Sequence, residues 1–134
     1  MAHVPVPALV KILLGAFVPV AAYMGLIFAL SAQSRPPVPR DIPDVFYHVP
    51  EYLVLSLLVI RGVRRIAPAI GAPAVACIAV FGATLYGASD EWHQSFVPGR
   101  VPSVHDLCSD AAGAILAVVV YYVAARIWSQ PSTA

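Results

Sequence analysis

The chain has 134 residues, of which 60% are hydrophobic and only 11% are charged, and its formal net charge is +1. A soluble domain carries about 25% charged residues, and a nucleic-acid-binding protein needs a basic stripe. The composition therefore excludes both classes and indicates an integral membrane protein with one domain, residues 1–134, surrounded by the lipid bilayer.

Four segments are apolar enough to be considered as membrane spans. A helix that crosses the bilayer needs about 20 mostly apolar residues, and the segments lie at about residues 11–30, 44–60, 68–89 and 106–128. The first could be mistaken for a signal peptide, but it lacks a clear small-residue cleavage site, so we interpret it as a retained helix. Because the connections are short, the sequence predicts an all-α protein of four antiparallel transmembrane helices.

The charges divide unequally between the two sides of this predicted bundle. The side with both termini has no acidic residue and carries five basic ones: Lys11, Arg61, Arg64, Arg65 and Arg126. The other side carries Arg35, Arg40 and Arg100 and all seven carboxylate side chains. Lys and Arg in short loops mark the cytoplasmic side, so we expect both termini in the cytoplasm and the acidic side facing outward.

The second segment has a polar face at its outer end. In "DVFYHVPEYLVL" the residues Asp44, His48, Glu51 and Tyr52 follow one another at steps of three, four or one, which places them on one side of a helix. Pro50 lacks a backbone N–H and predicts a kink beside this face. The alternative is that these groups lie solvated among the lipid headgroups.

The third segment carries a stripe that ends in the densest group of charges. Gly82, Tyr86, Asp90 and Gln94 recur every four residues, and Glu91 and His93 lie beside them. "VPG" then ends the helix, and Arg100 follows the turn. Its guanidinium is suited to bridging carboxylates of neighbouring helices, although a surface ion pair of little energetic value is the alternative.

The fourth segment begins with "SVHD", residues 103–106, which matches the capping box pattern. Asp106 therefore has a structural interpretation as a helix cap. Asp110 lies one turn deeper, and the small residues Gly113 and Ala117 continue its face. Small residues let helices approach closely in lipid, and an ionisable group at that depth normally faces protein or a water-filled cavity.

Three helices with polar outer ends predict one water-filled pocket near the outer membrane surface. The candidate ligand-binding residues are Asp44, His48, Glu51, Tyr52, Asp90, Glu91, His93, Gln94, Arg100, Asp106 and Asp110.

The same stretches resemble the VanZ-like family of small bacterial membrane proteins. The resemblance rests on "SAQS" after the first segment, on "DVFYHVPEYLVL" and above all on "LYGASDEWHQSFVPGRVPSVHDLCSDAAG". The family's polar positions correspond to the eleven candidates above, with Gly113 in addition. Two positions depart from the family pattern, since Val45 stands where a Lys is frequent and Ala117 where a second Gly is usual. The missing Lys puts any role for a cation at that position in doubt.

The resemblance implies a protein of the bacterial cytoplasmic membrane with a role in the cell envelope. The founding member of the family is associated with low-level resistance to teicoplanin, so a link to glycopeptide resistance is one expectation. Three interpretations of the pocket stay open. In the first, it binds or modifies a lipid-linked envelope precursor or an anionic lipid headgroup, with Arg100 contacting phosphate.

The second interpretation is a membrane-embedded enzyme, in which paired carboxylates and a histidine perform acid–base chemistry. Its candidate catalytic residues are Glu91, His93, Asp90, His48 and Glu51. A divalent cation would offset the repulsion between the acidic pocket and a phosphate, with Glu91, His93 and Asp110 as candidate metal ligands. The third interpretation is a structural polar lock that fixes the helices together.

Overall fold

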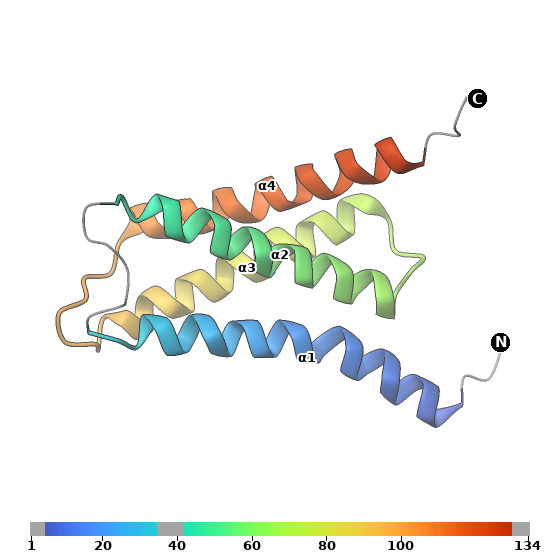
Figure 1. The fold of residues 1–134 in the computed structure, drawn as a ribbon, viewed down its shortest axis with the longest axis horizontal. Coiled ribbons are helices and arrows are strands. Elements are labelled where there is room, and N and C mark those ends of the chain that lie inside the picture. The colour runs from blue at the N-terminus through green and yellow to red at the C-terminus, as the bar shows by residue number, and fades with distance from the viewer. Residues whose placement is uncertain (1–4, 35–41, 130–134) are drawn as a thin grey trace.

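The computed structural model describes residues 5–34 and 42–129, and these residues contain four α-helices and no strand. The helices are α1 (Val6–Ser31), α2 (Val45–Ile66), α3 (Ala72–Gln94) and α4 (Val104–Trp128), drawn in Figure 1. The predictions of an all-α fold and of four helices are confirmed. The bounds differ from the predicted spans. Helix α2 continues six residues past residue 60, and α3 begins four residues later than predicted but continues past residue 89 through the polar residues Asp90 to Gln94.

All four helices are long and apolar enough to cross a membrane. The shortest has 22 residues, which gives a length of about 33 Å at a rise of about 1.5 Å per residue and exceeds the roughly 30 Å of the bilayer core. Many large apolar side chains are exposed on the outside of the bundle, among them Phe17 at 60%, Phe81 at 73% and Leu85 at 73%. Such a surface is suited to lipid rather than to water.

The polar residues gather at one end of the bundle, which we call the polar end. It consists of the last turns of α1 and α3 and the first turns of α2 and α4. A hydrogen bond from Ser31 to Asp90 joins α1 to α3 there, and one between His48 and Asp110 joins α2 to α4. The start of α1 and the end of α4 lie at the opposite end of the bundle (Figure 1). The predicted outer residues Arg35, Arg40 and Asp41 lie outside the described residues.

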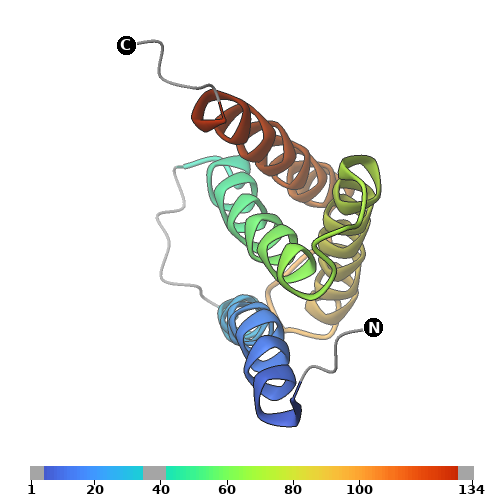
Figure 2. The same ribbon diagram turned by 90° about the vertical axis from the view of Figure 1, so that its right-hand side faces the viewer.

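Helix α2 packs against each of the other three helices, whereas α1 and α4 lie on opposite sides of it and do not contact one another within the described residues (Figure 2). The core below the polar end draws one or more buried residues from every helix: Ile27, Tyr52, Leu55, Ala83 and Ala114. A second core of Ile60, Val75 and Ala79 lies nearer the opposite end of the bundle. The polar end is therefore supported by a layer of packed apolar side chains.

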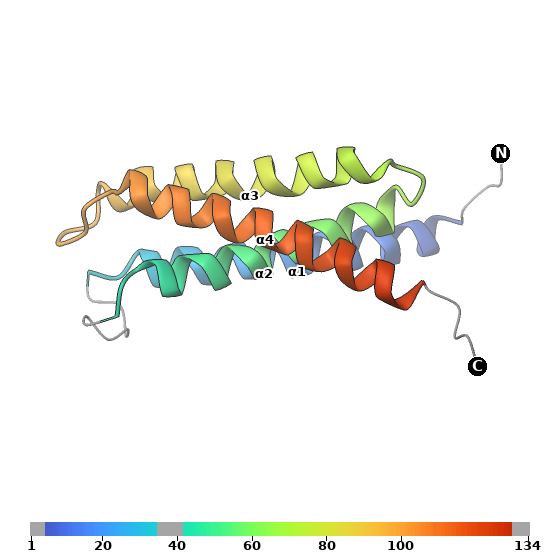
Figure 3. The ribbon, with the colours of Figure 1, turned by 90° about the horizontal axis from the view of Figure 1, so that it is seen from above.

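Helices α2 and α4 cross closely because Gly113 has no side chain (Figure 3). A Cβ at this position would overlap the backbone carbonyl of Val49 and lie 3.1 Å from the backbone nitrogen of Leu53. This contact fixes the rotation and height of α4 against α2, and so decides which residues of the two helices face each other at the polar end.

Pro19 interrupts the hydrogen bonding of α1, and α2 compensates for it. Proline has no N–H, so the helical bond to the carbonyl of Gly15 cannot form. Arg61 donates from Nη1 to that carbonyl oxygen at 2.9 Å. The carbonyl that the proline leaves free thus ties α1 to α2 at the end opposite the polar end.

Candidate functional site

The most deeply buried carboxylate of the polar end is that of Asp110, which is 1% exposed. Its Oδ1 lies 2.8 Å from Nδ1 of His48. Gly87 of α3 makes room for this side chain, because a Cβ at Gly87 would lie only 3.2 Å from the Cβ of Asp110. With Asp110 ionised, Nδ1–H of His48 donates to it, and the opposite ring nitrogen Nε2 is left with a lone pair.

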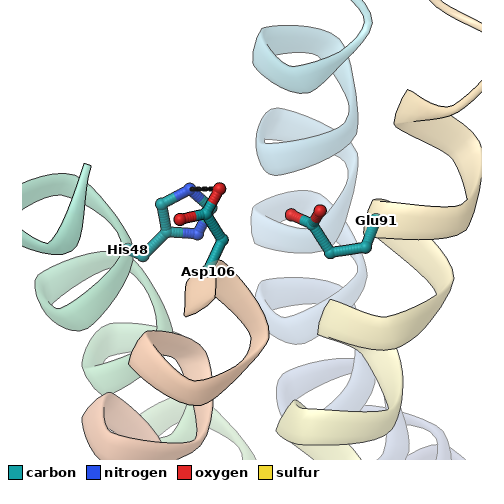
Figure 4. A group of neighbouring side chains, drawn as sticks. All are labelled: His48, Glu91 and Asp106. Atoms are coloured by element: carbon teal, nitrogen blue, oxygen red, sulfur yellow. Dashed lines mark ion pairs between the residues drawn. The ribbon is translucent and has the colours of Figure 1, made fainter. Parts of the chain in front are cut away.

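Asp106 and Glu91 face this second nitrogen of His48. Asp106 Oδ2 lies 3.9 Å from His48 Nε2, and both side chains are about one-seventh exposed. Figure 4 shows the carboxylate of Glu91, from α3, pointing toward His48 of α2 and Asp106 of α4. One ligand atom from each of the three residues lies within 4.8 Å of the others. Three helices thus converge on one point.

Glu91 has one satisfied and one unsatisfied oxygen. Its Oε2 accepts a hydrogen bond of 2.7 Å from the backbone N–H of Ser103, where α4 begins. The residue is only 7% exposed, and its Oε1 is buried without a hydrogen-bond partner among the described residues. A buried carboxylate oxygen without a partner is costly.

The predicted capping box forms only in part. The Ser103 hydroxyl caps α4 by accepting from the N–H of Asp106 at 3.3 Å. In a complete box the acidic side chain would bond back to the Ser103 N–H, but Glu91 occupies that donor. The cap of α4 is therefore Ser103, and the carboxylate of Asp106 is free to turn toward His48.

The group that comes together differs from the metal candidates of the sequence. Of Glu91, His93 and Asp110, only Glu91 belongs to it, and His48 and Asp106 complete it. Asp110 instead contacts Nδ1 of His48, the ring nitrogen that faces away from this group. The ring of His93 lies 4.4 Å from that of Phe28, measured between centroids, so this side chain packs against α1 rather than facing α4.

A second polar network ties α3 to α1 on the other side of α3. Ser31 donates to Asp90 Oδ1 at 2.6 Å, and Gln94 donates to Asp90 Oδ2 at 2.8 Å. Arg100 then donates from Nε and Nη2 to Oε1 of Gln94, at 3.1 and 2.7 Å. The prediction that Arg100 bridges carboxylates is wrong in the described part of the chain, where its guanidinium contacts the neutral amide instead and forms no ion pair.

A pocket of about 390 Å³ opens at the polar end between α1, α2 and α3. This is within the size range of small-molecule sites. Its polar wall contains six of the predicted residues: Asp44, His48, Glu51, Asp90, Gln94 and Arg100. Its apolar wall includes Leu26, Leu30, Phe46 and Val54, which are 37% to 66% exposed and face the outside of the bundle. The pocket thus joins a charged end to an apolar surface.

The remaining predicted residues have other positions. Tyr52 is 1% exposed and belongs to the apolar core, where its hydroxyl has no partner among the described residues. Asp44 belongs to the pocket wall, but it is exposed at the start of α2 and its side chain makes no capping bond. Sequence reasoning missed the roles of Ser31 and Gly87 and the bond from the Ser103 N–H to Glu91, although Ser31 begins "SAQS" and the capping role of Ser103 was predicted from "SVHD".

The geometry has two possible uses, which are not exclusive. The hydrogen bonds of Asp90, Asp110 and Glu91 each join two helices or a helix to a connecting segment, as a polar lock would. The pocket and the unsatisfied Glu91 oxygen go beyond what a lock requires, since a lock satisfies its buried polar atoms internally.

Of three comparisons with known proteins, one gave a match. Searches of curated proteins and of solved structures gave no match. The family model described as VanZ/LLP1 matches residues 8–125, which is most of the chain and includes all four helices except for the first two residues of α1 and the last three of α4. With four helices of membrane-spanning length and this match, the chain belongs to the VanZ/LLP1 family and is a multi-pass membrane protein.

Proposed function

We propose that the pocket between α1, α2 and α3 binds the phosphate-bearing headgroup of a cell-envelope lipid at the outer face of the bacterial cytoplasmic membrane. The observation that carries this proposal is the position of Arg100, whose guanidinium lies on the pocket wall against a neutral amide. Membership of a family whose founding member is associated with teicoplanin resistance supports an envelope role, and by extension a role in glycopeptide susceptibility.

Arg100 is held in place by a neutral amide and not by an ion pair within the described residues. Gln94 accepts two of its N–H groups and is itself fixed by Asp90. A guanidinium has five N–H donors in a planar arrangement that matches a phosphate. The remaining N–H donors make no hydrogen bond within the described residues and are therefore available to a phosphate in the pocket.

The apolar wall fits the rest of such a ligand. Leu26, Leu30, Phe46 and Val54 line the pocket from α1 and α2 and are exposed toward the surrounding lipid. An acyl or polyprenyl chain would lie against them while its phosphate reaches Arg100. Burial of apolar surface supplies roughly 25 cal/mol per Å², so several methylene groups on this wall would contribute appreciably to affinity.

The carboxylates of the pocket select the other part of the headgroup. Asp90 already accepts two hydrogen bonds, from Ser31 and from Gln94. Glu51 and Asp44 repel a phosphate but accept hydrogen bonds from hydroxyl or ammonium groups. The pocket therefore favours a headgroup that carries such donors beside its phosphate, as lipid-linked sugars and amines do.

The proposal requires the polar end to face outward, with both termini in the cytoplasm. The basic residues Arg64 and Arg65 in the last turn of α2 support that orientation. A reporter protein fused after residue 66 should then be active only in the cytoplasm, and one fused after residue 99 only outside. The opposite pattern would place the pocket in the cytoplasm and remove an outer-leaflet ligand.

Arg100→Gln tests the ligand most sharply. We expect the purified protein in detergent to bind a polyprenyl phosphate more tightly than the uncharged polyprenol of the same length. Arg100→Gln should lose this preference, a loss of about tenfold or more in affinity, because a hydrogen bond to a charged group contributes about 1.5–3 kcal/mol. The measurement is a binding titration with both lipids.

The matched control is Arg126→Gln, which removes an exposed arginine from the last turn of α4 at the other end of the bundle. It should retain the preference for the phosphate. Equal binding of phosphate and alcohol by the unaltered protein would refute a phosphate site. Testing phosphatidic acid alongside distinguishes a common anionic phospholipid from a polyprenyl-linked precursor.

A further inference from the structure

We infer that His48, Glu91 and Asp106 form a binding site for a divalent transition-metal ion such as Zn²⁺, with Asp110 orienting the histidine. The site lies on the α4 side of the polar end and shares only His48 with the pocket lining. The inference does not depend on which ligand the pocket takes.

Metal-ligand atoms from three helices converge at one point. One imidazole nitrogen and two carboxylate oxygens lie within 4.8 Å of one another, with His48 Nε2 and Asp106 Oδ2 at 3.9 Å. Two ligands of a tetrahedral zinc at about 2.0–2.1 Å are roughly 3.3 Å apart, so small side-chain rotations close the site. Mixed imidazole and carboxylate donors suit Zn²⁺ or Mn²⁺ better than Ca²⁺ or Mg²⁺, which prefer oxygen alone.

One carboxylate oxygen of Glu91 lacks a hydrogen-bond partner within the described residues. The residue is only 7% exposed. Its Oε2 accepts the Ser103 N–H, and its Oε1 has no partner within the described residues. The carboxylate points toward His48 and Asp106 (Figure 4). A metal ion at the convergence point would supply the missing partner of this buried oxygen.

Asp110 fixes the orientation of the His48 ring through its Nδ1 atom. A metal-binding histidine usually donates its second ring N–H to a carboxylate, which fixes the tautomer and the ring plane. Asp110 Oδ1 lies 2.8 Å from His48 Nδ1 and is almost fully buried, so it leaves Nε2 as the metal-binding atom. Three protein ligands leave coordination positions open for an oxygen from outside the chain, as in catalytic rather than structural zinc sites.

The test is the metal content of the full-length protein, purified without a histidine tag and titrated with Zn²⁺ alone. We expect one high-affinity Zn²⁺ per chain, measured by elemental mass spectrometry. Glu91→Gln and His48→Ala should lose it. Asp110→Asn should weaken binding by about 10- to 100-fold, as expected for a group that positions a ligand. Zn²⁺ should also raise the melting temperature of the unaltered protein but not of Glu91→Gln.

His105→Ala is the control for adventitious binding, because the His105 side chain is 76% exposed beside the site. It should retain the metal. No Zn²⁺ or Mn²⁺ in the unaltered protein, or a metal lost with His105→Ala but kept in Glu91→Gln, overturns the inference. Arg100→Gln should keep its metal, so failure of the lipid proposal and failure of the metal site give different results.

Discussion

Gly113→Ala should sharply destabilise the bundle, while the same change at Gly82 should be harmless. A Cβ at Gly113 overlaps the backbone carbonyl of Val49 and approaches the backbone nitrogen of Leu53 to 3.1 Å. Backbone atoms of a packed helix cannot move aside as a flexible side chain can, so α2 and α4 must separate. We expect a loss of about 3 kcal/mol, at the upper end of overpacking penalties, with a lower melting temperature in detergent.

Gly82 provides the control because nothing lies within 4 Å of a Cβ built there. Alanine at this helical position should be neutral or stabilise the protein by up to about 1 kcal/mol through its higher helix propensity. Similar melting temperatures for Gly113→Ala and the unaltered protein would show that the α2–α4 contact is looser than the structure gives.

The second large effect is expected for Asp110→Ala. This change leaves the Nδ1–H of His48 without its partner and opens a cavity beside Gly87, in a position that is 1% exposed. A hydrogen bond to a charged group contributes about 1.5–3 kcal/mol, and the cavity adds to the loss. We expect a large drop in melting temperature, and Asp110→Asn, which keeps a carbonyl oxygen for the same N–H, should recover part of it.

Asp44→Ala is the matched control for this carboxylate, because Asp44 is exposed and makes no side-chain capping bond at the start of α2. Its loss should change stability by no more than about 0.5 kcal/mol. If Asp110→Ala and Asp44→Ala melt alike, the His48–Asp110 contact does not hold the helices together.

The four helices could be predicted from the sequence because the bilayer imposes a length and a composition on each span. Their ends were less predictable. The apolar run of α3 stops near residue 89, but the helix continues to Gln94. In this last part Asp90 accepts a hydrogen bond from Ser31, and one oxygen of Glu91 accepts the N–H of Ser103, on the other side of α3.

The grouping of the polar residues was only partly predictable, because periodicity gives a face of one helix and not its rotation against the next. Asp110 and His48 were each assigned to a polar face, but their pairing depends on the contact at Gly113. The partner of Arg100 depends on the turn at Gly99, whose φ of 83° folds the chain back so that the guanidinium reaches Gln94. Charge alone predicted a carboxylate instead.

Native mass spectrometry of the protein extracted directly from bacterial membranes tests most directly whether the polar end is a binding site rather than only a lock. We predict that the unaltered protein carries one phosphate-bearing lipid, that Arg126→Gln keeps it, and that Arg100→Gln loses it while melting at the same temperature. A protein that carries no lipid, or the same lipid in the same amount in Arg100→Gln, would contradict the account and leave the polar network as a lock.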